Sequence, residues 1–153
     1  MGRESSKQTI LEIRDLEVQF ATEDGAVRAV DGVSLSIGEA ETLALVGESG
    51  CGKSVTALSI ARLVPEPPSR VTGGSIMLEG VNTLAMNSRE LRSLRGAKVA
   101  YVFQEPGSAL NPVFRVGDQI GEAIRLHRDL RGGAVAAEVL RLLKLVGIPA
   151  PEA

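Results

Sequence analysis

The first half of the chain alternates apolar and polar residues in short stretches, which is typical of strands with one buried face. Within residues 10–20 the apolar members are Leu11, Ile13, Leu16, Val18 and Phe20. The alternation slips once, near Arg14 and Asp15. Similar patterns predict strands at 26–31 and 33–37, with a break at Asp31-Gly32, and at 74–79. Glu23-Asp24-Gly25 predicts a turn between the strand at 10–20 and the strand at 26–31.

Two more continuously apolar stretches, 41–46 and 98–103, predict buried strands. Helical periodicity follows Ser54 and ends at Pro65, because proline interrupts a helix. Asn87 or Ser88 is positioned to cap a short helix that runs through Leu94. Two further helices are expected at 116–126 and 134–146. Strands first and helices last indicate a mixed α/β layout.

Composition narrows the class of protein. The 153 residues suit one domain, and 44% hydrophobic with 3% aromatic residues predicts an aliphatic core. A formal charge of −2 argues against a nucleic-acid-binding surface. The polar N-terminus, the lack of a long apolar run and the single cysteine predict a cytoplasmic protein that does not insert into the bilayer. Any action at a membrane would then depend on another subunit.

One motif carries specific chemistry. Residues 47–54 read GESGCGKS and match the phosphate-binding pattern G-x-x-x-x-G-K-[ST]. Glycines allow the backbone to turn so that its N–H groups surround an anion, and a strand before and a helix after are the context that the motif requires. Lys53 supplies a positive charge for the β- and γ-phosphates, and the hydroxyl of Ser54 is a ligand for Mg²⁺.

The predicted cofactors are therefore ATP and Mg²⁺. A chance glycine-rich turn is the alternative, and the flanking strand and helix argue against it. Cys51 occupies a variable position of the loop. It is either a small filler or a thiol that borders the nucleotide, and ATP protection from a maleimide would distinguish the two.

Three segments together resemble a known family. The loop GESGCGKS, the segment YVFQEPGSALNP at 101–112 and the opening AVRAVDGVSLSIGEAETLALVGESG are similar to ATP-binding subunits of ABC transporters. Within that family, TEDGAVRAVDGVS and FQEPGSALNP resemble the oligopeptide, dipeptide and nickel importers. The resemblance covers the chain from about Leu11 to Val146.

The resemblance implies a P-loop NTPase core with an N-terminal antiparallel β subdomain and the start of a helical subdomain. Residues 1–9 would be a flexible N-terminus, and 10–153 a partial nucleotide-binding domain whose helical subdomain begins at 113–153. The implied nucleotide-binding residues are Gly47, Glu48, Ser49, Gly50, Cys51, Gly52, Lys53, Ser54 and Phe20.

Two of the implied roles rest on single residues. Gln104 matches the glutamine that, in the family, contacts Mg²⁺ and the attacking water and couples the nucleotide to the membrane subunit; a surface-loop glutamine is the alternative. Phe20 matches the aromatic residue that stacks on adenine, but it also fits as the end of an apolar strand face. The implied metal ligands are Ser54 and Gln104.

Other family motifs do not occur in these 153 residues. There is no signature loop of the LSGGQ type, no apolar strand ending in Asp-Glu, and no histidine after such a strand. Glu79 and Glu105 lack the preceding aspartate, and the only histidine, His127, is expected on a helix. The chain is thus expected to be the N-terminal part of such a subunit, which binds ATP but does not hydrolyse it alone.

The implied partners are transmembrane permease subunits and a second ATPase subunit, with a location on the inner face of the cell membrane. The apolar residues Val113, Phe114 and Val116 are expected near the groove that receives the permease. Two other functions remain open: a non-catalytic nucleotide-binding regulatory module, and an unrelated P-loop kinase. The sequence does not indicate the transported substrate.

Overall fold

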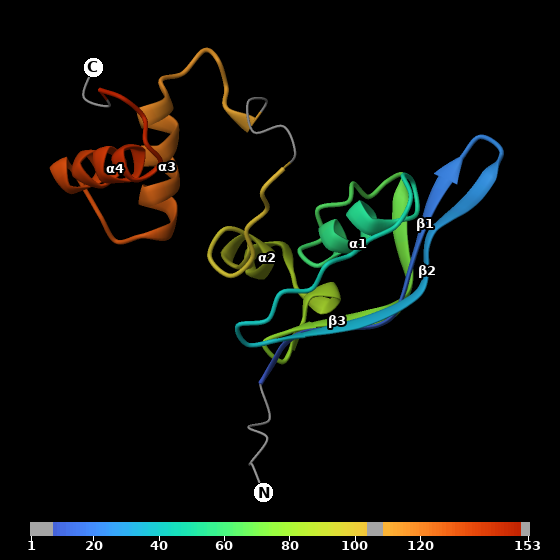
Figure 1. Cartoon of the computed structure of the whole chain (residues 1–153). Helices are drawn as coiled ribbons and strands as arrows, with labels where there is room; N and C mark the ends of the chain where they lie inside the picture. The colour runs from blue at the N-terminus through green and yellow to red at the C-terminus, as the bar shows by residue number, and fades with distance from the viewer. Residues whose placement is uncertain (1–7, 104–108, 151–153) are drawn as a thin grey trace, which may run out of the picture. The chain divides into compact units, whose positions relative to one another are not determined.

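The computed structural model describes residues 8–103 and 109–150 and is drawn in Figure 1. The chain divides into two compact units, with the division between Arg95 and Gly96. Each unit is described separately. Residues 1–7 of the predicted flexible N-terminus lie outside the described residues, and the first strand begins at Thr9.

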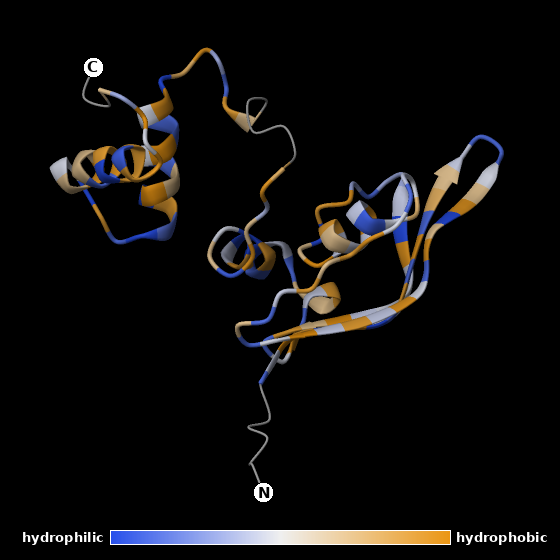
Figure 2. Cartoon of the chain, viewed as in Figure 1, coloured by the Kyte–Doolittle hydropathy of each residue, from blue (hydrophilic) through white to orange (hydrophobic). Residues whose placement is uncertain are grey.

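The first unit is built on an antiparallel sheet in the order β2-β1-β3-β4. The long strands are β1 (Thr9–Thr22), β2 (Gly25–Gly38) and β3 (Ser69–Leu78), and β4 is the short Val81–Asn82. Apolar and polar residues alternate along the long strands (Figure 2), as one buried face requires. The predicted N-terminal antiparallel sheet is confirmed, with β2 continuous across Asp31-Gly32 and β3 starting at Ser69 instead of 74.

The predicted slip in β1 is a bulge. Asp15 has a φ of +46°, and the pairing shifts between Ile13 and Leu16 on the β2 side. The extra residue moves Leu16 onto the face that Ile13 already occupies, and both side chains are at most 1% exposed. Gly74 of β3 lies opposite, and a Cβ there would come within 2.4 Å of the carbonyl oxygens of Arg14 and Asp15.

Two short helices and a 3-10 turn complete the first unit: α1 (Lys53–Ser59), η1 (Thr83–Ala85) and α2 (Ser88–Leu94). The predicted cap of α2 is confirmed and belongs to Asn87. Its side chain accepts hydrogen bonds from the N–H groups of Arg89 and Glu90, at 2.9 and 3.1 Å, and the Glu90 carboxylate accepts from the N–H of Asn87 at 2.8 Å.

The predicted extent of the helix after Ser54 is wrong, because α1 ends at Ser59. Arg62 takes a φ of +49°, and the N–H of Leu63 bonds back to the carbonyl of Leu58 at 2.9 Å. This reversal satisfies a carbonyl of the last turn and directs the chain away before the prolines.

The predicted strands at 41–46 and 98–103 are also wrong. Neither segment is a strand, although Val99 forms a single bridge. Val46 and Val102 are 88% and 98% exposed, respectively. A buried strand depends on neighbours that accept its backbone hydrogen bonds, and among the described residues neither segment pairs with a strand of the sheet. An apolar run alone was therefore insufficient to form a strand.

The second unit contains the helical hairpin of α3 (Val116–His127) and α4 (Gly133–Leu145), close to the predicted 116–126 and 134–146. Ile124, Val135 and Val139 are buried between the two helices. Gly121 allows α4 to approach, because a Cβ there would lie 3.4 Å from a methyl group of Val135. Among the described residues, no helix is both long and apolar enough to cross a bilayer.

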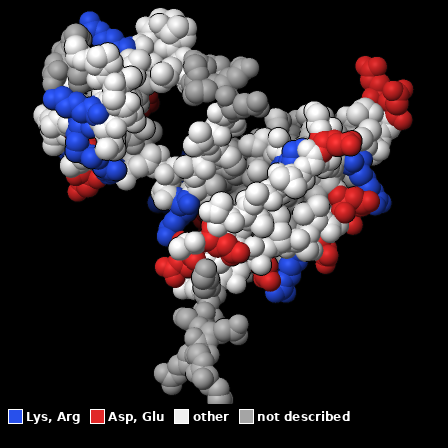
Figure 3. All heavy atoms as spheres, in the orientation of Figure 1, with Lys and Arg blue, Asp and Glu red and all other residues white. Residues whose placement is uncertain are grey.

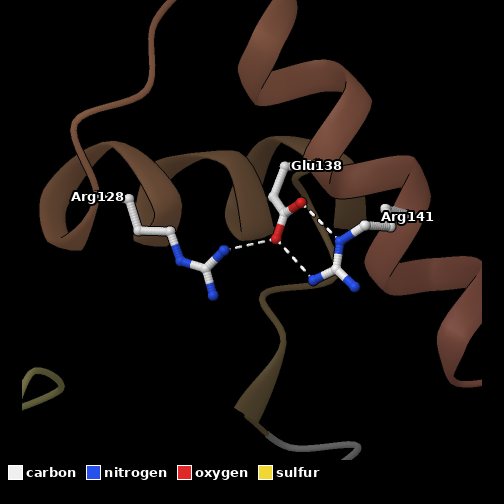
Figure 4. Close-up of polar contacts among 3 residues, drawn as sticks. All are labelled: Arg128, Glu138 and Arg141. Carbon is white, nitrogen blue, oxygen red and sulfur yellow. Dashed lines mark hydrogen bonds and ion pairs between the residues drawn. The ribbon is translucent and has the colours of Figure 1, made fainter.

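Glu138 on α4 joins this helix to the end of α3 (Figure 4). Its carboxylate accepts two hydrogen bonds from Arg141, at 2.7 and 2.8 Å, and one from Arg128 at 2.6 Å. The hydrogen bonds from Arg141 are the largest cause that lowers the pKa of Glu138. Together with the charge of Arg141 and the hydrogen bond and charge of Arg128, they outweigh desolvation and bring this pKa from 4.5 to about 2.

Candidate functional site

The candidate site is the loop 47–52, which leads directly into α1 (Figure 1). Lys53 is the first residue of the helix, and its ammonium group turns back into the loop. Its Nζ donates to the carbonyl oxygens of Gly47 at 2.8 Å and Glu48 at 2.6 Å, and lies 3.4 Å from the sulfur of Cys51. The loop thus surrounds one positive charge with its own backbone.

Gly52 seats the loop against the sheet. Its φ of +89° is a left-handed conformation that glycine adopts readily, and a Cβ here would lie 2.2 Å from the carbonyl oxygen of Ala29. Ala29 is the extra residue of a bulge in β2, because Val30 pairs with Val18 while Arg28 pairs with Gln19. The second fixed glycine of the motif is therefore required for two reasons, the backbone angle and the contact with β2.

The start of α1 is held by Thr56, which is 3% exposed. Its N–H and its hydroxyl both donate to the carbonyl oxygen of Gly52, at 2.8 and 3.0 Å. The neighbouring side chain of Ser54 is exposed. This arrangement fixes the turn that carries Lys53 and leaves the hydroxyl of Ser54 accessible to solvent and to a cation.

Two glycines of the loop differ in the space around them. Residues 47–51 are exposed, and a Cβ at Gly50 would meet nothing within 4 Å. At Gly47 a Cβ would lie 2.7 Å from the sulfur of Cys51 and 3.9 Å from Nζ of Lys53. A side chain at Gly47 would therefore collide with the sulfur of Cys51, so glycine lets these two parts of the loop approach each other.

Phe20 lies on the sheet of the same unit. It is half-buried in β1, two residues after Val18, and pairs with Val27 of β2. Val18 pairs with Val30, whose methyl group lies 3.5 Å from the Cβ position of Gly52. Since alternate residues of a strand share a face, Phe20 is on the face of the sheet that carries the loop.

The remaining predicted site residue, Gln104, lies outside the described residues. Before it, the rings of Tyr101 and Phe103 stack with centroids 6.3 Å apart and an interplanar angle of 20°. No group of three histidine, cysteine or acidic side chains that could hold a metal ion occurs within 8–103 and 109–150. Phosphate groups and water would be further oxygen ligands of a magnesium ion at Ser54.

The three residues expected to face a partner lie in the second unit and are exposed: Val113 at 83%, Phe114 at 62% and Val116 at 42%. Gln119 of α3 holds the loop before the helix. Its amide oxygen accepts from the N–H of Asn111 at 2.9 Å, and its amide nitrogen donates to the carbonyls of Asn111 and Phe114 at 2.9 and 3.1 Å.

Sequence reasoning missed Gln119 and Ala29. The hydrogen bonds of Gln119 span five to eight residues, and an amide side chain at one helical position gives no periodic signal. Ala29 acts through its carbonyl, so its side chain gives no indication of the contact with Gly52.

The spacing of the loop and its place before α1 match the phosphate-loop motif, and comparison with protein families identifies the class. The model of the ABC transporter family matches residues 30–152. The chain therefore belongs to the ABC transporter family.

The chain is 45% identical over 144 residues to the dipeptide transport ATP-binding protein DppD of Bacillus subtilis, which covers 94% of this chain and 43% of that protein. It is 41% identical over 143 residues to the oligopeptide transport ATP-binding protein OppD of the same organism, over 94% of this chain and 40% of that protein. The chain thus spans less than half the length of these two relatives.

Solved structures support the fold. The cassette MJ0796, in a dimeric post-hydrolysis state bound to ADP and Pi, is similar with a TM-score of 0.77 at 21% identity. That match covers 92% of this chain and 58% of the cassette. The predicted fold class, a mixed α/β ATPase cassette with an antiparallel N-terminal sheet, is confirmed.

Proposed function

We propose that this chain binds the phosphate groups of ATP through Gly47–Ser54. The observation that carries the proposal is the ammonium group of Lys53, which lies within its own loop, 2.8 and 2.6 Å from two backbone carbonyls. Carbonyl oxygens neutralise a lysine only partly, and phosphate oxygens carry full charges. Binding would therefore exchange these contacts for stronger ones.

Ser54 would contribute its hydroxyl to Mg²⁺, and Gln104 its amide oxygen. The ion would neutralise charge on the phosphate oxygens that it shares with the protein. Phe20 would stack its ring against adenine, and its position on the loop-bearing face of the sheet supports this role. The other loop residues, Glu48, Ser49 and Cys51, would contribute mainly their backbone.

The lysine is tested by Lys53→Ala, with labelled ATP in equilibrium dialysis. A hydrogen bond to a charged group contributes roughly 1.5–3 kcal/mol, which predicts about 10- to 150-fold weaker binding. Lys144→Ala is a matched control, because it removes the same charge from an exposed position on α4. Equal affinity for both variants would show that the loop does not bind the phosphates.

We further propose that the chain is part of the energy-coupling subunit of an importer for peptides or similar small solutes. Support comes from DppD and OppD, whose names describe dipeptide and oligopeptide transport. Such a subunit would work with transmembrane permease subunits and a second ATPase subunit, on the inner face of the cell membrane. Val113 and Phe114 would contact the permease, and a cysteine at position 114 should crosslink to it in an assembled transporter.

A regulatory nucleotide-binding module is the second candidate. Such a module would bind ATP through the same loop, Gly47–Ser54, without using the acidic pair and the signature loop that hydrolysis requires in the family. For this polypeptide alone, both candidates predict ATP binding with hydrolysis at the background rate. Only the transporter subunit predicts ATPase activity when the permease subunits and the remaining family motifs are supplied.

A further inference from the structure

A cavity lies in the first unit, between the turn after α1 and helix α2. Its volume is about 510 Å³. Three arginines line it, Arg62 from the turn and Arg92 and Arg95 from the end of α2, together with the carboxylate of Glu66. Leu63 and Leu91 form an apolar wall. Lys53 and the phosphate loop are not part of this lining.

Two of the arginines also hold the cavity in shape. Arg95 donates to the carbonyl oxygens of Ala61 at 2.9 Å and Arg62 at 2.6 Å. Arg62 in turn donates to the carbonyl oxygen of Met86 at 2.9 Å. These bonds join the turn after α1 to the segments on both sides of α2, so the cavity walls are fixed before any partner arrives.

The three arginines outnumber the one carboxylate at the cavity, that of Glu66, and none of the three forms an ion pair with it. Among the described residues, no carboxylate oxygen lies within 4.0 Å of a guanidinium nitrogen of Arg62, Arg92 or Arg95. Arg92 is exposed, and its side chain makes no hydrogen bond within the described parts of the chain. Each guanidinium has five N–H donors, and the bonds to carbonyls occupy only some of them.

The cavity is positively charged, whereas the first unit as a whole has more acidic than basic side chains. Residues 8–95 contain twelve acidic and eight basic side chains. On the face drawn in Figure 3, acidic side chains are spread along the sheet and at the end of the β1–β2 hairpin. Three of the eight basic side chains nevertheless meet at one cavity, where they repel each other. A bound anion would remove that repulsion.

We propose that the cavity receives an acidic peptide segment of a partner chain. A planar guanidinium pairs with a carboxylate through two parallel hydrogen bonds, and Leu63 and Leu91 provide contact for the aliphatic part of a glutamate or a neighbouring leucine. A phosphate group would pair with the guanidiniums in the same way, but it would leave the apolar wall without contact, which an acidic peptide with leucines would provide. The proposal does not depend on nucleotide binding at the phosphate loop.

The test uses a fluorescein-labelled peptide of Glu-Glu-Leu repeats and the same peptide with every Glu replaced by Gln, followed by fluorescence anisotropy. The acidic peptide should bind, and added salt should weaken the complex. Arg92→Gln should weaken it about 5- to 10-fold, corresponding to roughly 1–1.4 kcal/mol. Arg89→Gln removes a charge from the same exposed helix outside the cavity, and should change the affinity less than about twofold.

Three results would overturn the proposal: equal binding of the Gln peptide, equal losses in Arg92→Gln and Arg89→Gln, or displacement of the peptide by inorganic phosphate at similar concentration. The last result would indicate a phosphate site. Lys53→Ala should leave peptide binding unchanged, which separates this cavity from the phosphate loop. Amide chemical shifts of Leu63 and Leu91 on titration provide an independent location of the bound peptide.

Discussion

Replacing Gly52 with alanine tests how the phosphate loop is seated on the sheet. The new Cβ would lie 2.2 Å from the carbonyl oxygen of Ala29, well inside van der Waals contact. The residue would also hold a φ of +89°, which costs a residue with a Cβ roughly 1–2 kcal/mol. Overpacking adds about 1–3 kcal/mol, so Gly52→Ala should lower the free energy of unfolding by roughly 2–5 kcal/mol.

Gly50→Ala separates the two causes. Gly50 has a similar φ of +84°, but a Cβ there would meet nothing within 4 Å. Gly50→Ala should therefore lower the free energy of unfolding only by the cost of the backbone angle, roughly 1–2 kcal/mol. Gly32→Ala, with a φ of +69° and open space on β2, should cost about the same and lies outside the loop.

Urea unfolding followed by circular dichroism measures the three free energies, and equilibrium dialysis measures ATP binding. Gly52→Ala should lose both stability and ATP affinity, because relieving the contact moves the loop away from β2. Gly32→Ala should bind ATP as the unchanged chain does. Equal free energies of unfolding for Gly52→Ala and Gly50→Ala would falsify the role of the contact with Ala29.

Three further predictions concern other parts of the chain. Alkylation of Cys51 by a maleimide should be slowed by ATP, since its sulfur lies 3.4 Å from Nζ of Lys53, and an unchanged rate would place the nucleotide elsewhere. Leu16→Ala should cost about 2–5 kcal/mol of stability, because this fully buried side chain leaves a cavity in the sheet core, and a loss below about 1 kcal/mol in urea unfolding would contradict that packing. Because its pKa is lowered, Glu138 should stabilise the α3–α4 hairpin above about pH 4.5 and lose this effect as the pH falls toward 2. In Glu138→Gln the melting temperature should therefore fall less steeply over this acid range. The same acid dependence in both proteins would refute the role of the ion pair.

Local patterns in the sequence were sufficient for several elements. Alternation of apolar residues predicts β1 together with its bulge near Asp15. Ile13 and Leu16 are three positions apart, so they can share a face of the strand only if an extra residue lies between them. Asn87 followed three residues later by Glu90 predicts the start of α2, because a capping box involves only neighbouring groups. The loop 47–54 is likewise defined by its spacing, and the family follows from it and its flanking segments.

Only the tertiary structure decided features that depend on distant partners. The apolar segments 41–46 and 98–103 have the pattern of strands, but a strand needs backbone hydrogen bonds to a neighbour, and among the described residues neither segment pairs with a strand of the sheet. The contact of Gly52 with the carbonyl of Ala29 joins residues far apart in the chain through backbone atoms, which have no side-chain signal. The meeting of Arg62, Arg92 and Arg95 at one cavity likewise arises from packing of the turn after α1 against α2, since charge along the sequence does not indicate which side chains converge in space.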